Sequence, residues 1–141
     1  MELELHLSFG GQCRAAFAFY AQCLGGTITT MLTWGESPMA KSVPTTWHDA
    51  ICHATLNFDG GVLAGVDMPP ERYEKPQGFQ IILNIGDPLE ADRIFGALAE
   101  GGSVTLPIQR TFWAVRYGAV VDKFGVPWEI NCGNGSGDAA A

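Results

Sequence analysis

The chain has 141 residues, a length that fits one domain or two small halves with a shared core. Fifteen acidic residues against eight basic ones give a net charge of −7, which repels polyanions and argues against nucleic acid or an anionic membrane as a partner. The apolar stretches are too short to span a bilayer, and Met1 is followed by acidic residues rather than by a basic leader. We therefore expect a soluble globular protein of the cytoplasm.

The first half of the sequence contains the pattern of one strand, one helix and three further strands. Leucines alternate with polar residues before the first Gly-Gly pair, which predicts a strand with one apolar face. The helix that follows ends at Gly25-Gly26, and its apolar face is expected to carry Ala16, Phe19, Tyr20 and Cys23. The predicted elements are a strand at 3–9, a helix at 12–24, a strand at 27–34, a loop at 35–49, and strands at 50–58 and 62–66.

The second half repeats this order after a proline-rich linker. Asp87 and Pro88 are typical of a helix start, as N-cap and first helical residue. Asp122 precedes Gly125 and is expected to cap a turn. The predicted elements are a linker at 68–77, a strand at 79–85, a helix at 87–100, strands at 103–107, 113–121 and 127–132, and a disordered tail at 133–141.

The two halves also match residue by residue. A shift of 76 residues places Gly25-Gly26-Thr27-Ile28-Thr29 on Gly101-Gly102-Ser103-Val104-Thr105, which indicates an internal repeat of one supersecondary unit. Because neither half has much core of its own, we expect the modules at 1–67 and 78–132 to form one domain over 1–132. The four cysteines form neither a C-x-x-C pair nor a zinc spacing, so they are predicted to be buried thiols.

Several short motifs are distributed along residues 3–132. They lie at 9–20, 24–26, 51–56, 90–102, 111–113 and 117–118, and in Asp122-Lys123-Phe124-Gly125-Val126-Pro127-Trp128. With the duplicated βαβββ unit, these motifs resemble the vicinal oxygen chelate superfamily, which includes glyoxalase I, bleomycin-resistance proteins and extradiol dioxygenases. Within it the chain looks like the PhnB-like branch of small homodimeric proteins.

This resemblance implies an α+β fold in which two βαβββ repeats form a curled, mixed β-sheet with the helices outside. It also implies a homodimer, a small-molecule ligand and one divalent metal ion (Zn, Ni, Mn or Fe). No nucleotide cofactor is expected. Some PhnB-like proteins are labelled methyltransferases, but no glycine-rich turn joins a strand to a helix here, so that activity is not predicted.

The resemblance further implies where metal ligands lie, on the first and last strands of each half. Carried over position by position, it points to His6 and Glu129, with His53 and Gln80 as further ligand positions. The last strand of the first half offers only Ala64 or Gly65, so one ligand position is empty.

Each histidine has a second interpretation. His6 lies on the polar face of its strand, where it either faces solvent or presents a neutral imidazole to a divalent ion. His53 lies in an apolar strand, where a hydrogen-bonded core residue is the alternative to a ligand in a cavity.

Glu129 is the strongest candidate for chemistry. It lies between Trp128 and Ile130 in a strand expected to be largely buried, and a buried carboxylate needs a cation, a basic partner or a proton. Three roles stay open: metal ligand, ion pair with Arg116, and catalytic general base.

The residues predicted for a substrate pocket are Trp113, Arg116, Tyr117 and Trp128. The aromatic side chains suit a planar or apolar ligand, and the arginine suits a carboxylate or phosphate group. Core packing is the alternative for the aromatic residues, and a surface position for the arginine.

Three functions therefore remain. The chain is a metal-dependent, glyoxalase-like enzyme of lyase or isomerase type, a metal-free protein that binds and sequesters a small molecule, or a dimeric scaffold with a decayed site. One fold hosts many chemistries, so the resemblance does not choose among them.

Overall fold

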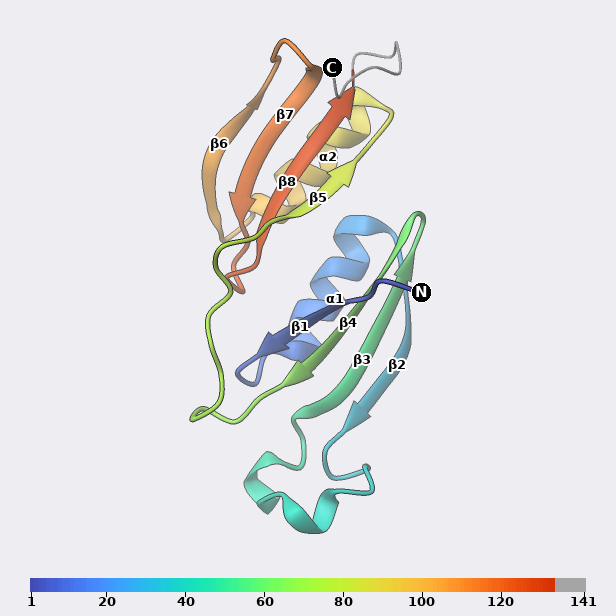
Figure 1. Ribbon diagram of the computed structural model, residues 1–141, viewed down its shortest axis with the longest axis vertical. Coiled ribbons are helices and arrows are strands. Elements are labelled where there is room, and N and C mark those ends of the chain that lie inside the picture. The colour runs from blue at the N-terminus through green and yellow to red at the C-terminus, as the bar shows by residue number, and fades with distance from the viewer. Residues whose placement is uncertain (134–141) are drawn as a thin grey trace. The chain divides into compact units, whose positions relative to one another are not determined.

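A computed structural model describes residues 1–133 (Figure 1). The chain divides into two compact units, Met1–Glu74 (unit 1) and Lys75–Ala141 (unit 2). Within residues 1–133, each unit contains one α-helix and one four-stranded mixed sheet, in the order strand, helix and three strands. Figure 1 shows each sheet as an open, curled surface with its helix on one side. The predicted α+β repeat is confirmed, with one sheet in each unit.

Unit 1 places its first strand beside its last. Its elements are β1 (Leu5–Phe9), α1 (Cys13–Leu24), β2 (Thr27–Thr33), the short 3₁₀ helices η1 (Ala40–Ser42) and η2 (Thr45–Trp47), β3 (Ile51–Phe58) and β4 (Gly61–Asp67). The sheet order is β1-β4-β3-β2, with β1 parallel to β4 and the other pairs antiparallel. The first strand was predicted to begin at residue 3 but begins at Leu5. Leu3 is 99% exposed, so its side chain buries no apolar surface against the unit.

Unit 2 repeats this topology. Its elements are β5 (Ile81–Asn84), α2 (Pro88–Ala99), β6 (Ser103–Gln109), β7 (Ala114–Val121) and β8 (Pro127–Gly133), in the sheet order β5-β8-β7-β6. The predicted helix start is confirmed, because Asp87 Oδ1 accepts a hydrogen bond from the Leu89 amide at 3.1 Å. Gly133 belongs to β8, and the rest of the predicted tail lies outside the described residues.

Helix α1 packs on the sheet of unit 1 through a slightly different face from the predicted one. Its buried residues are Cys13, Ala16, Phe17, Tyr20 and Cys23. Phe17 thus takes the core position predicted for Phe19, which is only half-buried. The edge of the Phe17 ring lies against Gly65, where an added Cβ would come within 2.6 Å of Phe17 Cε1.

The repeated Gly-Gly pair has the same two uses in both units. Gly25 and Gly101 each adopt φ 73°, the left-handed conformation that favours glycine after a helix. The second glycine lies against backbone: a Cβ on Gly26 would be 2.6 Å from the Asn57 carbonyl oxygen, and one on Gly102 would be 2.3 Å from that of Val121. The sequence repeat therefore reflects a helix end and a close backbone approach.

Asp67 is a buried polar group that lies between the predicted strand at 62–66 and the predicted linker at 68–77. Its side chain, 1% exposed, accepts backbone hydrogen bonds from Gly11 and Cys13 at Oδ1 (2.9 Å each) and from Ile51 at Oδ2 (2.8 Å). The carboxylate therefore joins the end of β4 to the starts of α1 and β3.

Asp122 has a related role in unit 2. It is 3% exposed and accepts from the amides of Phe124 and Val126, at 2.8 and 3.0 Å, which confirms the predicted turn cap. In addition, its Oδ2 accepts from the Trp128 indole at 2.8 Å, so the turn is tied to the core.

All four cysteines carry thiols rather than disulfides; Cys13, Cys23 and Cys132 are buried as predicted, whereas Cys52 is only half-buried. Burial, with the Asp67 charge as a smaller cause, raises the pKa of the Cys13 thiol to about 12. Within residues 1–133, no helix is both long enough and apolar enough to cross a membrane.

Candidate functional site

The helix in each unit defines which sheet face is left for a site. In unit 1, Gly65 faces α1, and its strand partners Leu7 and Ala54 share that face. Because side chains alternate along a strand, the neighbouring residues His6 and His53 point to the opposite face.

His6 and His53 come together on that face. Their ring centroids are 6.2 Å apart, and His53 Nε2 lies 3.2 Å from Thr55 Oγ1. Both histidines are exposed, so the alternative that His53 is a core residue is wrong. Two of the predicted ligand positions are therefore neighbours within unit 1.

Of Ala64 and Gly65, the two residues predicted at the position without a ligand, Ala64 is the one on the face of the histidines. Ala64 pairs with His6 in the parallel β1–β4 ladder, which places both side chains on the same sheet face. Gly65, the other candidate position, faces α1 instead.

In unit 2, the corresponding face carries Glu129. A Cβ on Gly118 would lie 2.8 Å from Phe95 Cε2 of α2, so Gly118 faces the helix and its neighbours Tyr117 and Ala119 face away from it. Glu129 pairs with Ala119 across the β7–β8 ladder and shares that face.

An aromatic cluster adjoins this carboxylate through Tyr117. The Tyr117 hydroxyl donates a 2.6 Å hydrogen bond to Glu129 Oε1. The Trp113 ring meets the Tyr117 ring edge-on, with the ring centroids 5.1 Å apart. The centroid of the Phe112 ring lies 4.7 Å from that of the Trp113 ring. The hydrogen bond to Glu129 raises the pKa of Tyr117, with desolvation and the negative charge of Glu129 as smaller causes.

Arg116 does not neutralise Glu129, so that part of the prediction is wrong. Its Nε donates to Asp92 Oδ1 of α2 at 2.9 Å, and its Nη1 donates to the Val115 carbonyl at 2.8 Å. A displacement of one residue along a strand reverses the face, so Arg116 lies on the helix side while Tyr117 lies with Glu129.

Trp128 and Gln80 also lie elsewhere than predicted. Trp128 is fully buried on the α2 side, where its indole donates to Asp122, so it belongs to the core rather than to an open pocket. Gln80 is exposed and precedes β5. The β5 residue that pairs with Glu129 is Ile82, which is 52% exposed.

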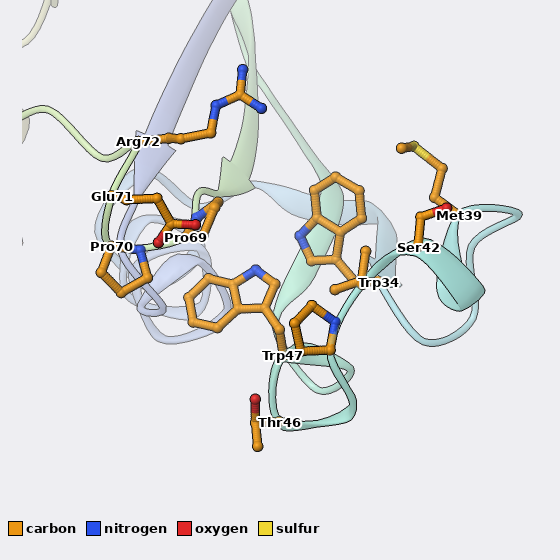
Figure 2. Close-up of a pocket in the computed structure, with 11 residues that line it drawn as sticks. Trp34, Met39, Ser42, Thr46, Trp47, Pro69, Pro70, Glu71 and Arg72 are labelled. Carbon is orange, nitrogen blue, oxygen red and sulfur yellow. The ribbon is translucent and has the colours of Figure 1, made fainter.

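Unit 1 also contains a pocket that was not predicted from the sequence. Its volume is about 420 Å³, and its walls come from the predicted loop and from the segment after β4, with Trp34 and Trp47 among the lining residues (Figure 2). Two tryptophans within or beside a proline-containing loop were the available signal, because such large apolar side chains are costly to leave in water.

Residues 6–130 match the family of the Glyoxalase/Bleomycin resistance protein/Dioxygenase superfamily. The chain belongs to this superfamily. The match spans both βαβββ units and confirms the resemblance drawn from the motifs.

Similar proteins agree with this membership. Protein YjdN from Escherichia coli (strain K12) is 35% identical over 139 residues, covering 93% of this chain and 95% of YjdN. Protein PA1353 from Pseudomonas aeruginosa is 44% identical with a TM-score of 0.83, over 94% of this chain and 98% of PA1353. A PhnB protein from Bacillus cereus has the same fold at 20% identity, with a TM-score of 0.78 over 94% of this chain and 99% of that chain.

The donor groups of unit 1 provide only part of a metal site. Catalytic metal sites use three protein ligands as a rule. Unit 1 offers the two imidazoles with Ala64 beside them, and residues 1–133 hold no group of three or more His, Cys, Asp or Glu side chains suited to one ion.

The Tyr117–Glu129 pair predicts a titration effect. In Glu129→Gln, the pKa of Tyr117 should fall toward its ordinary value, because a neutral amide oxygen accepts a weaker hydrogen bond than the carboxylate and the negative charge that opposes the phenolate is also gone. In the parent protein the raised pKa favours folding below the ordinary tyrosine pKa, and this contribution is lost as pH rises through the folded pKa. Alkaline titration followed by tyrosinate absorbance measures the shift, and Tyr117→Phe identifies which of the three tyrosines moves. An unchanged titration in Glu129→Gln contradicts the coupling.

Proposed function

We propose that this chain is a PhnB-like protein that binds a small organic molecule on the sheet face of unit 2 formed by Trp113, Tyr117 and Glu129. The observation that carries the proposal is the 2.6 Å hydrogen bond from Tyr117 to Glu129 beside the Trp113 ring. Ligand sites combine apolar aromatic walls with a few fixed polar groups, and this cluster supplies both.

The polar pair also gives the site a chemical capability. The Tyr117 hydroxyl occupies Oε1 of Glu129, so in this proposal the second carboxylate oxygen is the one that meets a bound molecule. A carboxylate fixed in this way accepts a hydrogen bond from the ligand, and in chemistry of lyase or isomerase type it takes a proton from one atom of the substrate and returns it to another. Glu129 is then the catalytic residue.

Dye binding tests the proposed face. With 1-anilinonaphthalene-8-sulfonate as probe, Trp113→Ala should weaken binding about tenfold, because an aromatic contact contributes on the order of 1.4 kcal/mol. Val104→Ala is the matched control: Val104 is 48% exposed, but it pairs with buried Val120 on the other face of the sheet. Fluorescence titration gives both dissociation constants.

The same titration can contradict the proposal. Equal binding by Trp113→Ala and Val104→Ala, with both variants melting as cooperatively as the parent, shows that the dye does not use this face.

A metal-dependent enzyme is the second candidate, and the neighbouring His6 and His53 rings favour it. FosX from Listeria monocytogenes, a protein with this fold at 12% identity and a TM-score of 0.66, has been solved in complex with Mn(II). Here His6 and His53 would hold the ion, which when bound would polarise an oxygen of the substrate. Participation of Gln80 and Glu129 in the same ion remains a prediction from the sequence.

Thermal melts with Zn²⁺, Ni²⁺, Mn²⁺ and Fe²⁺, together with elemental analysis, test this candidate. An ion bound by the folded state raises the melting midpoint, and His6→Ala and His53→Ala should both abolish the rise. His48→Ala is the control, since the His48 imidazole instead contacts the carbonyls of Ala40 and Val43 at 2.9 Å. If Glu129 is also a ligand of the ion, as predicted, Glu129→Gln should reduce the ion-induced rise of the melting midpoint. A rise that survives in both His6→Ala and His53→Ala excludes them as ligands.

A further inference from the structure

The pocket of unit 1 is a candidate site of its own, lined by residues of that unit alone. Trp34 follows β2, Trp47 ends η2, and Pro69 and Pro70 follow β4. Figure 2 shows the two indole rings within one pocket, with the two prolines and Glu71 on its other side. Its volume of about 420 Å³ lies within the range of about 300–1,000 Å³ usual for small-molecule sites.

Hydrogen bonds hold the pocket walls in place. The Trp34 indole donates to the Asp67 carbonyl at 3.1 Å. The His48 ring fixes the loop behind Trp47 through its contacts with two backbone carbonyls. On the other side, the Arg72 amide donates to the Pro69 carbonyl at 2.9 Å, which closes a turn. A pocket with fixed walls loses little conformational entropy when it binds a ligand.

The Trp47 indole is the unusual group in the pocket. Its ring lies over Gly11, where an added Cβ would be 3.7 Å from Cη2. Its Nε1 is buried and has no hydrogen-bond partner among residues 1–133. Figure 2 shows this nitrogen on the ring edge that is turned toward Trp34 and Pro69. A buried donor without an acceptor is destabilising, and such groups in folded proteins call for an explanation.

We propose that this pocket binds a small, neutral heteroaromatic molecule whose ring carries a hydrogen-bond acceptor for Trp47 Nε1. The indole and proline surfaces pack well against a flat ring. The acceptor provides the hydrogen-bond partner that Trp47 Nε1 lacks, once the indole ring turns far enough to bring this buried nitrogen to the pocket surface. Glu71 and Arg72 both line the pocket with opposite charges, so neither a cation nor an anion is favoured.

The test uses two probes of nearly equal shape, quinoline with a ring-nitrogen acceptor and naphthalene without one. Titration of the ¹⁵N-labelled protein follows the indole N–H signals of its four tryptophans. Quinoline should shift the signals of Trp47 and Trp34 and bind about tenfold more tightly than naphthalene, because only quinoline pairs with the buried donor. The signal of Trp113 in unit 2 should not move, which separates this site from the proposed function.

Trp47→Phe provides the matched variant, because it keeps an aromatic ring and removes the N–H. The preference for quinoline over naphthalene should disappear in Trp47→Phe and persist in Trp113→Phe. Equal affinity of the parent protein for the two probes overturns the proposal. This comparison uses the parent protein alone, so it does not depend on whether a variant folds. Signals of Trp34 and Trp47 that change with protein concentration, and not with quinoline, assign the pocket to a second copy of the chain and also overturn it.

Discussion

Asp67→Ala should lower the free energy of unfolding of unit 1 by about 3–6 kcal/mol, because it leaves three backbone N–H groups without their acceptor. The amides of Cys13 and Ile51 are buried and that of Gly11 is partly buried, so water replaces the carboxylate poorly. Each of the two fully buried donors costs about 1–3 kcal/mol when orphaned, and the partly buried Gly11 amide costs less because water reaches it. The three bonds connect β4 to α1 and β3, so their loss affects most of the unit.

Urea denaturation followed by circular dichroism and tryptophan fluorescence measures this loss. Asp67→Asn should fall between the parent and Asp67→Ala, because its amide oxygen keeps two of the three bonds while its NH₂ group faces the third donor. Asp59→Ala is the control, since Asp59 is exposed in the turn between β3 and β4 and should change stability by less than about 0.5 kcal/mol. Similar midpoints for Asp67→Ala and Asp59→Ala contradict the role assigned to Asp67.

The same residue links stability to the pocket of unit 1. The Asp67 carbonyl accepts from the Trp34 indole while its carboxylate holds the start of β3. One residue, Asp67, therefore contacts both a pocket wall and the start of β3, so the shape of the pocket depends on a folded unit 1. Binding by Trp34 and Trp47 is best compared among variants with equal melting midpoints.

The repeat architecture was predictable because its determinants are local. Alternating leucines, helical spacing, the Asp87-Pro88 helix start and the two Gly-Gly pairs each specify an element without reference to the rest of the chain. Asp67 could not be recognised in this way. Its three partners lie 16 to 56 residues away in the sequence, so its role arises only when the strands pair.

The candidate site was predictable in residue type but less so in orientation. His6, Tyr117 and Glu129 were named from the sequence as candidates, whereas Arg116, offered as a partner for Glu129, lies on the opposite face of its strand. Strand alternation shows that Arg116 and Tyr117 face opposite ways, but the side that carries the helix is decided by packing. In unit 2 that side is set by Gly118, whose missing side chain leaves room for Phe95 of α2.

Gly102→Ala should lower the free energy of unfolding by about 3 kcal/mol, and Gly26→Ala should have a similar effect. In each case the new methyl group meets a backbone carbonyl oxygen, at 2.3 Å for Gly102 and 2.6 Å for Gly26, and no rotamer change can move it away. Relief requires the start of β6 or β2 to separate from its neighbouring strand.

Gly96→Ala is the matched control and should have the opposite sign. Gly96 is exposed within α2, and a Cβ there meets no atom within 4 Å, so alanine should stabilise the helix by about 0.5–1 kcal/mol. Urea midpoints of the three variants measure the difference. Parent-like stability in both Gly26→Ala and Gly102→Ala contradicts a steric cause for the glycine repeat. If Gly26→Ala and Gly102→Ala both lose stability while Gly96→Ala gains it, the Gly-Gly repeat is explained by the same backbone contact, formed once in each unit.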